Sequence, residues 1–75
     1  MEKIENINGY DVYLMSKEEC WREGLAYPTY IIIADDWDYD RFEPCYEDRI
    51  EEFDNLHEAR QWCIRNPRYD DEDDI

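Results

Sequence analysis

The residues best suited to chemistry in this sequence are carboxylates, and they concentrate between residues 35 and 54. This segment holds ten acidic residues against Arg41 and Arg49, which gives a net charge of −8 in twenty residues. Carboxylates can bind cations, transfer protons or present negative charge to a basic partner. Because they are so abundant here, pairs at the separation used by glycosidases arise by chance, and such a pair does not indicate an enzyme.

A calcium site is the most specific chemistry that this segment suggests. Asp36, Asp38, Asp40 and Glu47 occupy positions 1, 3, 5 and 12 of the EF-hand loop pattern. Position 6, where that loop needs glycine, is Arg41, and a strand rather than a helix is expected before the segment. We therefore expect no specific metal site, and only weak condensation of cations on the carboxylates.

Cysteine and histidine offer little for catalysis. Cys20, Cys45 and Cys63 are widely separated without C-x-x-C spacing, and His57 is the only histidine in the sequence. In number, the three cysteines and His57 would suffice for a Cys3His zinc site, and two of the cysteines could form one disulfide and leave the third as a free thiol. However, zinc ligands usually come in close pairs, and the sequence has no secretory segment to favour a disulfide. We predict reduced, partly buried thiols, no cofactor and no enzymatic activity.

The chain as a whole is strongly acidic. Its 75 residues include 22 acidic residues and 8 lysines and arginines, for a net charge of −14. This balance excludes a nucleic-acid binder of the usual basic kind and disfavours an anionic membrane as partner. No apolar run approaches the roughly 18 residues of a membrane span, and the N-terminus lacks the apolar core of a signal peptide. A cytoplasmic location is expected.

The density of negative charge is comparable to that of a nucleic acid. At one charge per roughly 1.7 Å, the 14 net charges correspond to about 24 Å of duplex DNA, close to the diameter of a domain of this size. This match suggests a domain that presents carboxylates where a basic protein groove expects phosphates. The aromatic residues among the acids either continue the preceding strand into the core or anchor an interface.

The residues that we predict to bind a partner combine the central acids with two interleaved aromatics. They are Asp35, Asp36, Trp37, Asp38, Tyr39, Asp40, Glu43, Glu47 and Asp48. The alternative interpretation is that these acids form a solvated surface that only keeps the protein soluble.

Turn signals outline the first elements that must position these residues. Asn8-Gly9 predicts a tight turn, and the alternation of residues 10–14 predicts a strand after it. Ile4 and Ile7 suggest a partner strand, but their spacing of three puts them on opposite faces of a regular strand.

Capping signals predict two helices. Ser16 and Glu19 form a capping box for a short helix that Gly24 ends, and this helix is expected to pack through Trp21. Asp54 or Asn55 caps the last helix, which ends at Asn66-Pro67. The residues on the buried face of that helix are Leu56, Ala59 and Cys63.

The remaining segments complete a small α+β domain over residues 1–69. The apolar run of residues 28–34 predicts a strand covered on both faces, and residues 49–53 predict another strand. We therefore expect an antiparallel sheet of three to four strands packed against one C-terminal helix, with a short helix after the first strand. Residues 70–75 are predicted to form an acidic, disordered tail.

In its small size, its acidity, its lack of a catalytic constellation and its economical mix of strands and helices, the chain as a whole resembles small phage-encoded anti-defence proteins. These include anti-CRISPR proteins and DNA-mimic anti-restriction proteins. The resemblance implies an inhibitor in the host cytoplasm that binds a basic nucleic-acid-handling complex, and no direct contact with nucleic acid. Two other functions stay open: a small cytosolic adaptor or self-assembling subunit, and a calcium-responsive module.

Overall fold

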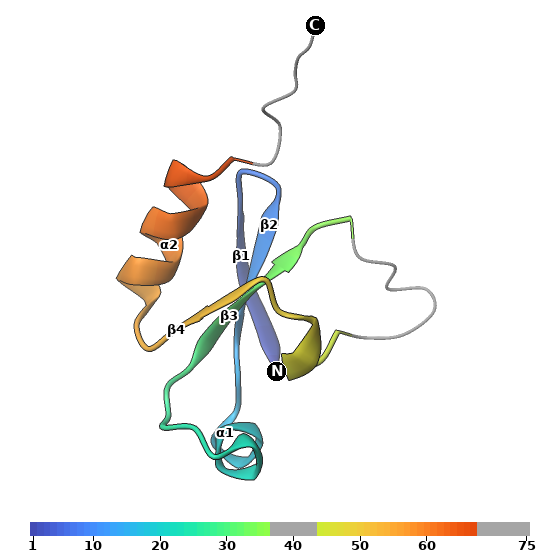
Figure 1. Ribbon diagram of the computed structural model, residues 1–75, viewed down its shortest axis with the longest axis vertical. Coiled ribbons are helices and arrows are strands. Elements are labelled where there is room, and N and C mark those ends of the chain that lie inside the picture. Colours follow the sequence, from blue (N-terminus) through green and yellow to red (C-terminus); the bar gives the residue numbers. More distant parts are fainter. Residues whose placement is uncertain (37–43, 68–75) are drawn as a thin grey trace, which may run out of the picture.

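The computed structural model describes residues 1–36 and 44–67 of the chain. The strands form one antiparallel sheet in the order β1-β2-β3-β4, and α2 lies across one face of it (Figure 1). The elements are β1 (Glu2–Ile7), β2 (Tyr10–Leu14), α1 (Lys17–Glu23), β3 (Tyr30–Ala34), the 3-10 helix η1 (Tyr46–Asp48), β4 (Glu51–Phe53) and α2 (Leu56–Arg65). The predicted α+β fold is confirmed, with the short helix following the second strand rather than the first. The tail prediction falls on residues outside those described.

The Asn8-Gly9 turn joins β1 and β2 as predicted. Both residues have a positive φ, 52° and 90°, as a two-residue hairpin turn requires. The expectation that Ile4 and Ile7 face opposite sides was wrong, because the register of β1 shifts between Lys3 and Glu5. This bulge adds one residue to β1, so both isoleucines pack on the side of the sheet that α2 covers.

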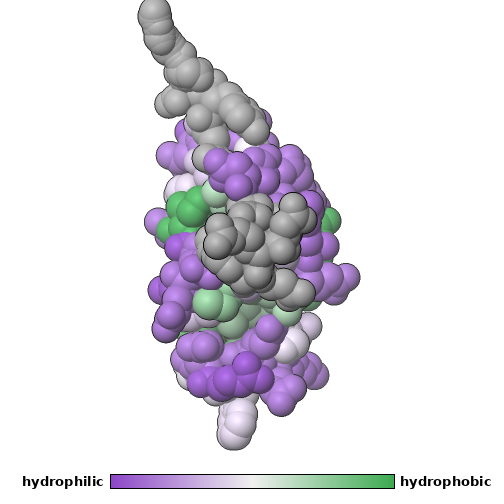
Figure 2. Space-filling view, turned by 90° about the vertical axis from the view of Figure 1, so that its right-hand side faces the viewer, coloured by the Kyte–Doolittle hydropathy of each residue, from purple (hydrophilic) through white to green (hydrophobic). Residues whose placement is uncertain are grey.

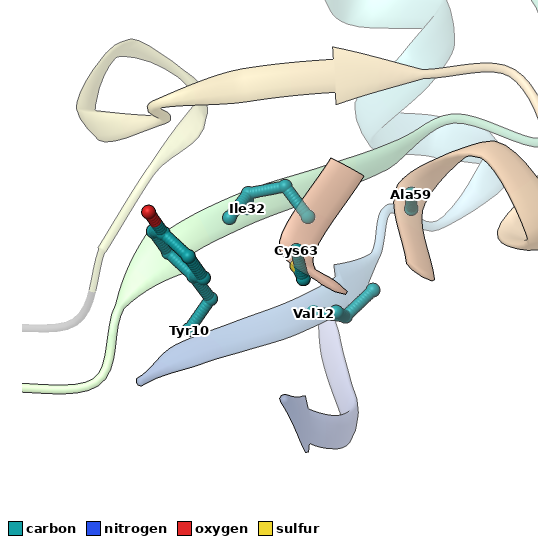
Figure 3. Close-up of a cluster of buried hydrophobic side chains, with 5 residues drawn as sticks. All are labelled: Tyr10, Val12, Ile32, Ala59 and Cys63. Atoms are coloured by element: carbon teal, nitrogen blue, oxygen red, sulfur yellow. The ribbon is translucent and has the colours of Figure 1, made fainter. Parts of the chain in front are cut away.

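Two apolar clusters lie on the two sides of the sheet, and β3 belongs to both. Ile31, Ile32 and Ile33 are all fully buried, as the apolar run predicted. The cluster beneath α2 consists of Tyr10, Val12, Ile32, Ala59 and Cys63 (Figure 3). The cluster on the opposite side consists of Tyr13, Met15, Cys20, Ile31 and Ile33, with Leu25 and Tyr46 packed against it.

Helix α2 is fixed at both of its ends. The Asn55 side chain accepts a 2.8 Å hydrogen bond from the backbone N–H of Glu58, so Asn55 rather than Asp54 is the N-cap. At the other end, the Tyr10 hydroxyl donates to the backbone carbonyl of Asn66, and the Tyr10 ring packs edge-on against Trp62. These contacts hold the helix on β2.

Helix α1 has the predicted capping box and the predicted glycine at its end, where Gly24 has a φ of 75°. The prediction that it packs through Trp21 was wrong, since Trp21 is 83% exposed and Cys20 is the buried residue. The helix presents only a narrow stripe to the sheet. One residue along a helix turns the side chain by about 100°, and this carries Trp21 out to solvent.

The strand and cysteine predictions need smaller corrections. β4 begins at Glu51 rather than Arg49, because the backbone N–H of Arg49 donates to the Tyr46 carbonyl at the end of η1. All three cysteines are free thiols, with Cys20 and Cys63 buried and Cys45 exposed.

Candidate functional site

Four of the nine predicted partner-binding residues lie in the described part of the chain. Asp35 and Asp36 follow β3, and the backbone N–H of Asp35 donates to the carbonyl of Gly9 at the β1–β2 turn. Glu47 and Asp48 belong to η1. The predicted residues outside the described ranges are Trp37, Asp38, Tyr39, Asp40 and Glu43.

The two described pairs lie on the same side of the sheet but not in one cluster. Tyr46 packs on the apolar cluster opposite α2, which places η1 on that side. Asp35 accepts a 3.1 Å hydrogen bond from Asn6, whose side chain also contacts Asp11. Asp11 pairs with Ile33 across the sheet and so points to the side opposite α2. The predicted acids therefore occupy two separate places along this side.

Helix α1 adds carboxylates that the sequence analysis missed. Glu19 and Glu23 line a depression between α1 and η1, together with Arg22, Cys45 and Tyr46. We define the acidic face as Glu19, Glu23, Asp35, Asp36, Glu47 and Asp48. Figure 2 views this side of the molecule, and its described surface is largely hydrophilic. The capping box in the sequence predicted that Glu19 lies at the start of a helix. It did not predict that this helix lies beside η1, because that depends on the tertiary fold.

Arg49 pairs with a carboxylate that lies on this side of the sheet but outside the acidic face. The Arg49 guanidinium lies 2.8 Å from the Glu52 carboxylate and stacks 3.9 Å above the Tyr46 ring. The Tyr46 hydroxyl donates to the same carboxylate, and this hydrogen bond raises the pKa of Tyr46. Within the described ranges, Glu23 and Glu47 have no cation within 4 Å, so their charges face solvent.

Glu19 is held as a carboxylate by its neighbours. Burial raises the pKa of Glu19, but hydrogen bonds from the Met1 ammonium, at 2.8 Å, and from the backbone of Ser16 outweigh it. The resulting pKa lies below the usual value. Glu19 therefore stays charged at neutral pH while it anchors the start of α1.

Helix α2 brings two arginines to the other side of the sheet. Arg60 forms a 2.6 Å ion pair with Glu5 of β1, and Arg65 lies in the last turn of the helix. Arginines at this position are favourable next to the C-terminal end of a helix dipole. Cations of the described residues therefore occur on both sides of the sheet, with Lys3, Lys17, Arg22 and Arg49 on the side of the acidic face.

No group of three or more potential metal-ligating side chains occurs among residues 1–36 and 44–67. His57 is exposed on α2. A hydrogen bond to Asp48 raises the pKa of the Cys45 thiol, and burial raises the pKa of Cys63 to about 11. Both shifts reduce the thiolate fraction that a nucleophile needs.

Comparisons with protein-family models, curated proteins and solved structures find no match for this chain. The helices in the described ranges are too short and too polar to cross a bilayer.

Proposed function

We propose that this protein binds the basic, nucleic-acid-binding surface of a target protein or complex and inhibits it by occupying the place of the nucleic acid. It would act in the manner of an anti-CRISPR or DNA-mimic protein, in the cytoplasm of a host cell and without catalysis or a cofactor. The observation that carries the proposal is that carboxylates from α1, from the end of β3 and from η1 lie on one side of the sheet, in two separate places along it.

The extent of the acidic face suits a nucleic-acid-binding groove. The five residues of β3 separate Asp35 and Asp36 from the α1 end of the sheet. At about 3.3 Å per residue, this distance is on the order of 15 Å, or about half a turn of duplex DNA. A basic groove would therefore meet negative charge at both ends of the face and also at η1.

The cost of this charge supports a binding role. Like charges on a compact domain repel one another and destabilise it. Solubility alone needs a net charge of roughly 2 to 8 in magnitude for a small domain, and this chain has −14. Such an excess is useful where it accelerates association with a basic partner, because long-range attraction raises the association rate.

A competition experiment with matched variants tests the proposal. The protein is immobilised, host lysate is applied, and the captured complex is challenged with duplex DNA and with RNA. We expect a nucleic-acid-handling complex that either nucleic acid displaces. If the captured partner binds its nucleic acid and this protein at the same time, the proposed inhibition is wrong.

Charge variants on the two sides of the sheet give the control. The triple variant Glu23→Gln, Asp36→Asn, Glu47→Gln removes three charges from the acidic face. The variant Glu2→Gln, Glu51→Gln, Glu58→Gln removes three exposed charges elsewhere. We expect the first to associate more slowly with the target and to show a weaker salt dependence, while the second changes little. Equal effects would indicate a general charge effect and contradict a specific face.

The adaptor function has one observation in its favour, which is the exposure of large apolar side chains. Trp21, Tyr27 and Ile64 are 83%, 47% and 53% exposed. An adaptor would bury them against its partner and keep that interface in high salt. A mimic's complex would weaken under the same conditions.

A further inference from the structure

Trp21 is exposed to solvent on a helix whose backbone is fixed at both ends. The neighbouring Cys20 is buried, and its carbonyl accepts a 2.7 Å hydrogen bond from the backbone N–H of Leu25. The capping box between Ser16 and Glu19 fixes the other end of α1. Trp21 is therefore exposed although α1 itself is fixed against the rest of the domain. An aromatic side chain with only two rotatable bonds loses little conformational freedom when it binds a partner.

Two aromatic rings that lie beside residues of α1 already carry cations of their own chain. Arg49 lies over Tyr46, and the Lys17 ammonium lies 5.6 Å from the centre of the Tyr27 ring. Among residues 1–36 and 44–67, no cation, ring or hydrogen-bond partner is found for the Trp21 indole, while the backbone carbonyl of Trp21 accepts from Gly24. Its indole face is thus available to a cation from outside.

A carboxylate lies beside this indole. Glu18 is three residues before Trp21, a spacing that places the two side chains on neighbouring positions of one helix face. The Glu18 side chain is 81% exposed, and its contact with Arg22 is long, at 3.9 Å. An indole face next to an exposed carboxylate suits a guanidinium, which can stack on the ring and donate hydrogen bonds to the carboxylate at once.

We propose that Trp21 and Glu18 form an anchor point for an arginine side chain of the basic partner. This inference rests on the proposed function and names the residue that the partner inserts. Lysine fits less well, because its ammonium is a compact, strongly hydrated charge that does not stack as a planar group. The acidic face then governs association, while the anchor slows dissociation.

Two synthetic peptides of equal length and charge test the anchor. One alternates arginine with serine and the other lysine with serine. Affinities are measured by calorimetry, and the three indole N–H signals of the tryptophans are followed by NMR, with the Trp21 signal assigned by Trp21→Phe. We expect the arginine peptide to bind about two- to fivefold more tightly than the lysine peptide, as an exposed cation–π contact allows. The Trp21 signal should shift most.

The variant Trp21→Leu separates stacking from apolar contact and is expected to fold, because the side chain is exposed. It should bind both peptides with equal affinity, whereas Ile64→Ala on α2 should keep the arginine preference. Retention of the preference in Trp21→Leu, or its absence in the wild type, would overturn the anchor. The triple charge variant should weaken both peptides and keep their ratio. If the triple charge variant binds both peptides as tightly as the wild type does, the electrostatic basis of the proposed function is wrong, whatever the result for Trp21.

Discussion

The side-chain amide of Asn6 donates a 2.9 Å hydrogen bond to the carboxylate of Asp11, which is only 1% exposed. The same nitrogen lies 3.1 Å from a carboxylate oxygen of Asp35, and the Lys3 ammonium lies 3.5 Å from Asp11. Asn6 therefore links a buried carboxylate to the start of the acidic segment. This link fixes one end of the acidic face to the β1–β2 hairpin.

Replacing Asn6 should destabilise the fold. Asn6→Ala removes one donor from a buried carboxylate, and the loss of such a donor costs about 1–3 kcal/mol. Urea unfolding should show a lower midpoint with an unchanged slope. The exposed Glu2→Ala on the same strand should change the free energy of unfolding by less than about 0.5 kcal/mol. Equal stability of Asn6→Ala and the wild type would show that other partners satisfy Asp11.

Much of this fold follows from local signals in the sequence. The Asn8-Gly9 turn, the capping box at Ser16 and the apolar run of Ile31–Ile33 each depend on residues close together in the chain. Their consequences were therefore predictable from spacing alone. The α+β arrangement followed once these elements were placed in order.

The failures have a different physical origin, since each depends on contacts between distant segments. The bulge that turns Ile4 towards α2 depends on the register with β2. The exposure of Trp21 depends on which narrow stripe of α1 meets the sheet. Among the site residues, Asp35, Asp36, Glu47 and Asp48 were found from their charge pattern. Glu19 and Glu23 were missed because only the tertiary fold brings α1 next to η1.

The N-cap of α2 can be assigned by comparing two neighbouring residues. Asn55→Ala removes the side-chain acceptor for the Glu58 N–H and should lower the free energy of unfolding by about 1 kcal/mol. Asn55→Asp should retain most of the stability, because aspartate caps as well as asparagine. Asp54→Ala should lower the free energy of unfolding by less than Asn55→Ala does. Thermal unfolding of the three variants gives their order of stability. A larger loss at Asp54 would move the cap by one residue.

Burial of Cys63 predicts a decline of stability at alkaline pH. The pKa of this thiol is raised from 9.0 to about 11 in the folded protein. Between these values the unfolded chain releases a proton that the folded protein retains, so ionisation favours the unfolded state as the pH rises. The stability that the protonated Cys63 thiol contributes is fully present below pH 9.0 and is lost as the pH rises towards about 11. Urea unfolding across this window measures the slope.

Cys63→Ala provides the comparison for that slope. This variant should be less stable at neutral pH, because it leaves a small cavity beneath α2. Its stability should nevertheless fall less steeply above pH 9 than that of the wild type. Alkylation under native conditions gives an independent check, with the exposed Cys45 modified well before Cys20 and Cys63. Identical alkaline slopes in the two proteins would show that Cys63 does not titrate in this range.

The self-repulsion of the chain predicts that salt stabilises it. The net charge is −14, and the charges lie closer together in the folded protein than in the unfolded chain. Their repulsion therefore destabilises the folded state, and salt weakens that repulsion by screening. The melting temperature should therefore rise by several degrees on addition of sodium chloride. The triple variant Glu23→Gln, Asp36→Asn, Glu47→Gln should melt higher than the wild type in low salt and gain less from added salt.

Calcium and magnesium should raise the melting temperature equally at equal concentration, because screening depends on ionic charge and not on coordination geometry. A specific calcium site would instead stabilise the folded state by mass action, beyond the effect of magnesium. Asp36 occupies the first position of the EF-hand pattern, so Asp36→Asn is the informative variant. An excess calcium shift that Asp36→Asn abolishes would contradict screening and establish the calcium-responsive function. If calcium and magnesium shift the melting temperature equally in the wild type and in Asp36→Asn, the acids act through their charge alone. The proposed binding to a basic partner requires this behaviour.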